Sequence, residues 1–172
     1  MVIMTDAMRE LATRAKLDTV TSVDLPPRAG ELLDAGWVRE GDGAWVLAAL
    51  RRSYSGRRAA FDDLTGYEAA VNGRAVYDLD FPRGEERAAR LLRRACAVSR
   101  AALDQLRSVP DAPVVTALIT ISRSFTEDPE WVGSQTFWAE HEGEQPYVEI
   151  DGGASDELLM SMSSRFPDSV GC

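Results

Sequence analysis

A run of 25 residues with apolar side chains at helical spacing constrains the fold of this chain more than any other feature. Residues 84–108 place alanine, leucine and valine on one face and five arginines on the other. Such a stripe is typical of an amphipathic helix whose apolar side covers a second apolar surface. Glu85 and Glu86 suit its first turn, where the helix dipole favours negative charge, and Pro110 follows its end. We therefore predict one long helix over 84–108 that packs on a sheet.

The remaining chain supplies candidate strands for that sheet. Residues 113–122 (PVVTALITIS) alternate strongly and are predicted to form a central strand. Asn72-Gly73 is the type I′ turn signal of a hairpin over residues 66–82, and Gly41-Asp42-Gly43 is the turn of another over 37–50. Further strands are predicted over residues 130–140 and 146–152, with a turn at 142–145.

Helices are predicted at both ends of the chain. Residues 6–16 have helical periodicity, a short helix is expected between Asp24 and Gly36, and Ser155 is a candidate N-cap for a short helix over 154–166. The fold class is therefore α+β: an antiparallel β-sheet packed against one long helix, with N-terminal helices and a short C-terminal helix. We expect a single domain over residues 1–172, in which residues 1–50 form a helical and hairpin subregion.

Four arginines lie within the eight residues RRSYSGRR, at positions 51–58. Strand-like residues precede and follow this stretch, and Ser55-Gly56 is typical of a turn. The segment is predicted to connect two antiparallel strands. Its arginines would then flank a turn and discourage aggregation at a sheet edge.

Charge is unevenly distributed in a chain whose net charge is −9. Residues 1–50 carry −3, residues 51–107 carry +4, and residues 108–172 carry −10, from 2 basic and 12 acidic side chains. Such asymmetry can steer a charged partner, here a basic protein, or let two copies meet head to tail in a homodimer. Two solvated faces that compensate each other within one molecule are the more common cause of such a distribution. Overall acidity argues against nucleic acid as the partner.

The sequence predicts a cytoplasmic protein that does not cross a membrane. No run approaches eighteen apolar residues, and the N-terminus lacks the charge and apolar pattern of a signal peptide. The two cysteines, Cys96 and Cys172, are far apart and suggest neither a zinc site nor a disulfide framework. No cofactor and no resident metal are predicted.

Candidate catalytic groups are sparse, so an enzyme is the less favoured interpretation. His141, the one histidine, lies between two glutamates and is predicted to be a solvated residue at a hairpin turn. Asp62, Asp78 and Asp80 could form a carboxylate group for magnesium or calcium in an enzyme of unrecognised type. The competing interpretation places these aspartates on the solvent-exposed face of a sheet, opposite arginines.

Two resemblances suggest functions. Residues 10–47, with the helix ending in LLDAGWV before a short hairpin, resemble part of a winged-helix domain, which implies a DNA-binding regulator using residues 1–50. Pro26-Pro27 and the few arginines depart from that pattern. The whole layout is similar to secretion-chaperone-like domains and bacterial immunity proteins, which bind one protein partner.

The favoured hypothesis is a protein-binding module of immunity-protein or secretion-chaperone type with a basic partner. The acidic final third supplies its candidate contact residues, and tryptophan is enriched at binding hot spots. The predicted partner-binding residues are Glu127, Asp128, Glu130, Trp131, Glu140, Glu142 and Glu144.

Overall fold

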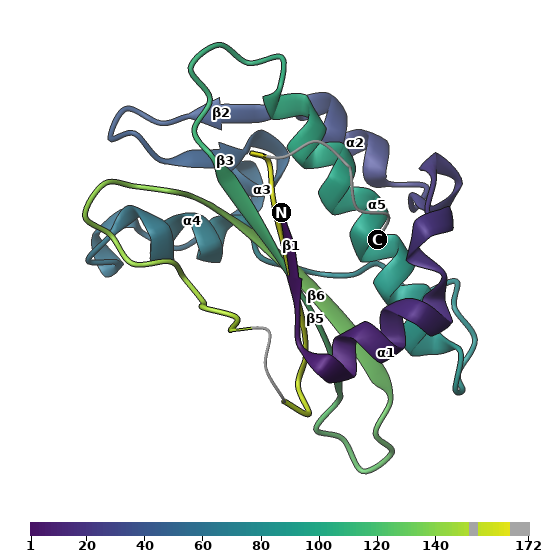
Figure 1. Cartoon of the computed structure of the whole chain (residues 1–172). Helices are drawn as coiled ribbons and strands as arrows, with labels where there is room; N and C mark the ends of the chain where they lie inside the picture. The colour runs from purple at the N-terminus through teal and green to yellow at the C-terminus, as the bar shows by residue number, and fades with distance from the viewer. Residues whose placement is uncertain (152–154, 166–172) are drawn as a thin grey trace.

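A five-stranded antiparallel sheet carries the fold, and a long helix, α5 (Arg87–Leu106), lies across one of its faces (Figure 1). The computed structural model describes residues 1–151 and 155–165. The strand order is β1-β7-β5-β6-β4. The strands are β1 (Val2–Met4), β4 (Arg74–Ala75), β5 (Val115–Arg123), β6 (Trp131–Ala139) and β7 (Leu158–Ser163).

The predicted α+β class is confirmed, and β5 is the central strand as expected. Alternate side chains of β5 point to opposite faces, because the side-chain period of a strand is two. The buried series is Val115, Ala117, Ile119 and Ile121, and it packs in one core with buried α5 residues such as Leu91. The long amphipathic helix and the alternating strand therefore bury their apolar faces against each other.

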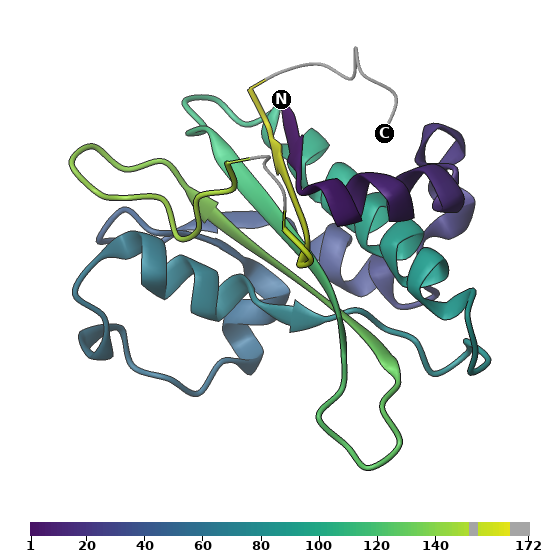
Figure 2. The same cartoon turned by 60° about the horizontal axis from the view of Figure 1, so that its bottom comes forward.

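Two N-terminal helices flank α5 on the same side of the sheet (Figure 2). They are α1 (Asp6–Ala15) and α2 (Ala29–Ala35), within the predicted ranges, and the short 3₁₀ turns η1 (Leu17–Thr19) and η2 (Ser22–Asp24) connect them. The Thr5 hydroxyl caps α1 by accepting a hydrogen bond from the Met8 amide. The sequence did not predict β1, which precedes α1 and pairs with β7.

The hairpin predicted over residues 37–50 forms, with strands β2 (Trp37–Arg39) and β3 (Trp45–Leu47). The strand pair predicted around residues 51–58 was wrong. Helix α3 (Ala48–Ser53) begins directly after β3, and a 3₁₀ turn, η3 (Arg58–Ala60), follows. Two of the four arginines of this stretch bind the β2–β3 turn instead. Arg51 pairs with Glu40 at 2.7 Å, and Arg58 pairs with Asp42 at 2.9 Å.

The hairpin predicted around Asn72-Gly73 was also wrong. Residues 64–72 form helix α4 (Leu64–Asn72), which Asp63 caps by accepting a hydrogen bond from the Gly66 amide. A type I′ turn requires positive φ at both central residues, but φ of Gly73 is −75°. Only β4 remains of the predicted second strand, and residues 76–86 form a connection to α5.

The C-terminal helix predicted with Ser155 as its N-cap was wrong, because this region forms β7. Met160 and Met162 are buried in the core, while Ser161 and Ser163 lie on the other face, so the side chains alternate with the period of a strand. Residues 166–172, including Cys172, lie outside the described residues. The strand predicted over 146–152 does not form in the described part, 146–151.

The second face of the sheet, opposite α5, is covered differently. Helix α4 packs beside β6, where the Thr136 hydroxyl donates to the Ala69 carbonyl. The segment 140–151 runs from the end of β6 without regular structure, and the rings of Trp138 and Tyr147 lie 5.7 Å apart. Among residues 1–151 and 155–165, no helix has the length and apolar character needed to span a membrane.

Candidate functional site

The structure places the predicted partner-binding residues at opposite ends of β6. One group, 127–131, lies at the β5–β6 connection, and the other, 140–144, follows the last residue of the strand. A nine-residue strand is about 30 Å long, so these residues form two separate surfaces.

The connection between β5 and β6 projects beyond the rest of the fold (Figures 1 and 2). We call residues 124–130 the hairpin tip. The Ser124 amide donates to the Glu130 carbonyl at 2.8 Å, and the Glu130 amide donates to the Ser124 hydroxyl at 2.9 Å. The Thr126 hydroxyl donates to the Asp128 carbonyl, and Arg123 donates to the Pro129 carbonyl. These bonds hold the hairpin tip in one defined conformation.

Phe125 is the most exposed large apolar residue in the described chain, and it lies within the hairpin tip. Its ring is fully exposed, at 107% of the reference area. Glu127 and Asp128, two of the predicted residues, are exposed beside it in the chain. The sequence prediction missed Phe125, and the signal that could have revealed it is an aromatic residue in a polar stretch, RSFTEDPE.

The other two predicted residues of this end contact the body of the protein. Glu130 accepts from Arg83 at 2.5 Å and lies 3.8 Å from Arg87. Trp131 is half-buried, with the guanidinium of Arg123 4.1 Å from its ring centroid. Both residues therefore anchor the hairpin, while Phe125 is its uncovered aromatic side chain.

The predicted residues that follow β6 are Glu140, Glu142 and Glu144, and one of them, Glu144, binds the start of α4. Glu144 accepts hydrogen bonds from the Leu64 and Thr65 amides and from the Thr65 hydroxyl, at 2.7 to 3.0 Å. Burial acts to raise the pKa of Glu144, but these bonds at the start of α4 leave its pKa below the ordinary value. Glu140 pairs with Arg165 at 3.3 Å, and Glu142 is exposed.

His141 is not the solvated turn residue that the sequence predicted. Its side chain is 15% exposed, and Nε2 lies 2.9 Å from Oε1 of Glu68, which is fully buried in α4. The two Glu68 oxygens also accept from the Trp45 and Ala139 amides, each at 2.6 Å. Burial raises the pKa of Glu68, and the bonds from Trp45, Ala139 and His141 oppose that rise.

His141 also lines a pocket of about 630 Å³ on the second face of the sheet. We call it the sheet pocket. Its floor includes side chains of β1, β5, β6 and β7, and the segment 144–151 forms its outer wall. Apolar and polar side chains both line it, among them Ile3, Thr116, Trp138 and Ser161.

The aspartates considered for a metal site do not come together as one. Asp78 accepts from Arg87, and Asp80 binds Arg94 through two bonds of 2.6 and 2.9 Å. The side-chain hydrogen bond from Arg94 lowers the pKa of Asp80. Asp62 is exposed. Within residues 1–151 and 155–165, no group of three or more histidine, cysteine, aspartate and glutamate side chains is placed to hold a metal ion.

The segment that resembles a winged-helix domain is built into the rest of the fold. β1 pairs with β7, and the β2–β3 hairpin is held to α4 through backbone bonds of Trp45 and Leu47. Arg93 of α5 donates to Asp24 and to carbonyls at the end of α1. The hairpin that would act as a wing therefore packs within the protein.

Comparison with known proteins gives no relative: no protein-family model, no curated protein and no solved structure matches the chain.

Proposed function

We propose that the protein is a binding module that docks on a protein partner through the hairpin tip. The observation that carries the proposal is the full exposure of Phe125 at the end of a projecting hairpin. Large aromatic side chains are enriched in the buried centres of interfaces, where they fill pockets of the partner. Burying a phenylalanine side chain is worth about 1.5–3 kcal/mol relative to leaving it in water.

The hydrogen bonds within the hairpin tip support this role. Association costs free energy when a loop must become ordered at the interface. Ser124 and Thr126 form hydrogen bonds to backbone groups of the tip on the far side of Phe125, and the exposed side chain of Arg83 pairs with Asp128 at 3.1 Å and with Glu130 at 2.5 Å. A tip ordered before binding loses less entropy when it docks.

The chemistry of the tip indicates the chemistry of the partner. Phe125 requires an apolar pocket, and the exposed carboxylate of Glu127, beside the Asp128 carboxylate that already pairs with Arg83, favours lysine or arginine around that pocket. The partner we propose is thus a basic protein in the cytoplasm. Inhibition by an immunity-type protein and masking by a secretion-chaperone-type protein are the two roles suggested by the resemblances in the sequence layout.

The test is affinity capture from a lysate of the source organism, followed by binding measurements with the purified captured protein. We expect one stoichiometric basic protein whose capture weakens at high salt, because the charged part of the contact is screened. Phe125→Ala should weaken binding by about tenfold or more, as truncation of a hot-spot aromatic does. Reversing the charge of Glu127 and Asp128 together should mainly slow association.

Val23 supplies the matched control. It is 90% exposed in η2, so Val23→Ala also removes an exposed apolar side chain, outside the hairpin tip. Equal binding by the wild type, Phe125→Ala and Val23→Ala would show that the tip is not the docking site. A captured partner that is acidic, or DNA in place of a protein, would contradict the proposed partner chemistry.

A further inference from the structure

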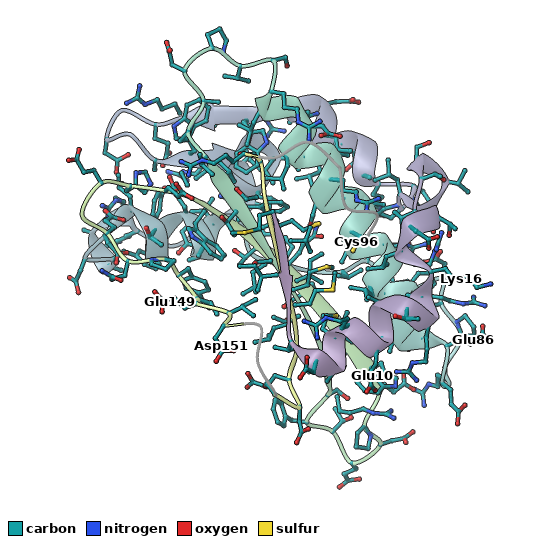
Figure 3. All side chains as sticks on the ribbon, viewed as in Figure 1. Glu10, Lys16, Glu86, Cys96, Glu149 and Asp151 are labelled. Atoms are coloured by element: carbon teal, nitrogen blue, oxygen red, sulfur yellow. The ribbon has the colours of Figure 1, made fainter. Side chains whose placement is uncertain are left out.

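A second pocket lies on the α5 face of the sheet, where residues of α2, α3, β4 and α5 come together. We call it the helix pocket. Its volume of about 310 Å³ is at the lower end of the range of about 300–1,000 Å³ that is typical of ligand pockets. Arg94 and Val98 line it from α5, and Cys96, labelled in Figure 3, lies between them in the sequence. Its lining residues lie outside the hairpin tip, so an inference about it is independent of the proposed protein partner.

Gln135 of β6 is a buried polar residue of this pocket, with only 7% of its surface exposed. The Ser99 hydroxyl of α5 donates to its side-chain oxygen at 3.4 Å, so the carboxamide lies on the α5 face of the sheet. A carboxamide also carries two N–H donors on its nitrogen. Among residues 1–151 and 155–165, no group accepts a hydrogen bond from Nε2 of Gln135. Because buried polar groups normally have partners, this donor suits an acceptor on a bound ligand.

Arg74 places a positive charge beside this donor. It lies directly opposite Gln135 in the antiparallel pair of β4 and β6, so both side chains start from the same face of the sheet. Its guanidinium donates to the Gly73 carbonyl and the Ser53 hydroxyl at 2.7 Å, and to the Leu50 carbonyl at 3.4 Å. These acceptors are neutral, so they hold the side chain in place without cancelling its charge. Arginine stays protonated in proteins, so this charge depends on no titration.

The other charged side chains of the helix pocket leave a positive excess. Arg94 is compensated, because two of its nitrogens bind the carboxylate of Asp80. Arg28 precedes α2 and Glu31 lies in its first turn, and both are exposed and form no ion pair within the described part of the chain. The uncompensated charges are thus Arg28 and Arg74 against Glu31. This balance favours a carboxylate ligand over an ammonium ligand.

We propose that the helix pocket binds a small carboxylate that carries an aromatic or branched aliphatic group. The carboxylate accepts a hydrogen bond from Nε2 of Gln135 near the guanidinium of Arg74. A buried charge is tolerated when it is both paired and hydrogen-bonded, and these two side chains supply both interactions. The apolar group lies against the larger apolar lining residues, which are Leu32, Leu50, Val76 and Val98.

The side-chain amides of the protein make the test direct. The chain contains one asparagine and three glutamines, so proton–nitrogen NMR of the full chain shows four side-chain NH₂ pairs, and triple-resonance assignment identifies that of Gln135. The probes are phenylacetate and 3-methylbutanoate, titrated at pH 7.5, with 2-phenylethylamine as the matched cation. We expect a saturable shift of the Gln135 pair with both acids. The amine should give none at the same concentrations.

Three variants, compared by calorimetric titration with phenylacetate, separate the contacts of the pocket from general charge effects. Gln135→Met removes the donor at similar side-chain length and should weaken binding by about tenfold or more, because a hydrogen bond to a charged group is lost. Arg28→Gln should weaken binding by about two- to fivefold, the effect of losing one exposed charge contact. Lys16→Gln removes the same charge at the end of α1, outside the pocket lining (Figure 3), and should leave affinity unchanged.

Three results would overturn the proposal. Two come from the wild-type protein and do not depend on whether a variant folds: no saturable shift of the Gln135 pair with either acid, or binding of 2-phenylethylamine as tight as that of phenylacetate. The third is an equal loss of affinity in Arg28→Gln and Lys16→Gln, because bulk electrostatics would then account for the attraction.

Discussion

Glu68 and Asn72 lie one helical turn apart on α4 and together bind five backbone groups of two different strands. Glu68 accepts from the Trp45 and Ala139 amides. Asn72 accepts from the Leu47 amide and donates to the Trp45 and Phe137 carbonyls, at 2.9 to 3.1 Å. β3 and β6 do not pair with each other, so these two side chains take the place of the missing strand ladder.

Asn72→Ala should strongly destabilise the protein. The substitution leaves three buried backbone groups without their partner, and each buried unsatisfied group costs about 1–3 kcal/mol before relaxation. We expect the free energy of unfolding to fall by about 3 kcal/mol in urea titrations. Asn72→Asp keeps an acceptor for Leu47 but loses both donors, so it should be no more stable than Asn72→Ala. A loss below about 1 kcal/mol in either variant would mean that water replaces these bonds.

Glu144→Gln should remove part of the acid sensitivity of the fold. The pKa of Glu144 is lowered in the folded protein, so its stabilising contribution is present above the ordinary value of 4.5 and is lost as pH falls through the folded pKa. The variant should therefore be less stable than wild type at pH 7, and the difference should shrink in urea titrations below about pH 4. Glu142→Gln, in the same segment, is the control and should match wild type at both pH values. A difference between Glu144→Gln and wild type that stays constant with pH would exclude this linkage.

Arg93→Lys should weaken the contact between α5 and the end of α1 and thereby lower the stability of the protein. The guanidinium of Arg93 binds both oxygens of Asp24 and donates to the Ala15, Lys16 and Thr19 carbonyls. A lysine ammonium cannot reproduce this fork, so we expect a loss of about 2 kcal/mol in unfolding free energy. Arg90→Lys is the control on the same helix, because Arg90 makes an exposed pair with Glu86 that is worth less than about 0.5 kcal/mol. Thermal melts of the two variants that coincide would contradict the structural role of Arg93.

The longest elements that the sequence predicted correctly are those with a strong local period. α5 and β5 repeat apolar residues at 3.6 and 2 positions over many residues, and each pattern has one structural solution. α4 and β7 were assigned wrongly because contacts distant in sequence decide them. Asn72 is a residue type typical of turns, but here it is buried between two strands. Met160 lies in a strand because its side chain packs in the core with residues of α5.

In the candidate sites too, the sequence revealed groups of neighbouring residues but not contacts between residues far apart in the chain. Glu127 and Asp128 could be grouped from the sequence because they are adjacent in the chain. The contact between Glu68 and His141 joins residues 73 positions apart, and no local pattern marks either as a partner of the other. The interpretation that placed the aspartates opposite arginines holds for two of them, because Asp78 pairs with Arg87 and Asp80 pairs with Arg94.

Gly133→Ala should test how closely α5 approaches the sheet. A Cβ atom at Gly133 would lie 3.1 Å from side-chain carbons of Ile121 and Val76 and 3.5 Å from Leu91 of α5. These neighbours are packed in the core, so accommodating the methyl group requires the helix or the strand to shift, and overpacking of this kind costs about 1–3 kcal/mol. Gly41→Ala, where the added Cβ meets open space, should change the unfolding free energy by less than about 0.5 kcal/mol. Equal stability of the two variants in urea titrations would show that the α5 interface has room that the contact distances do not allow.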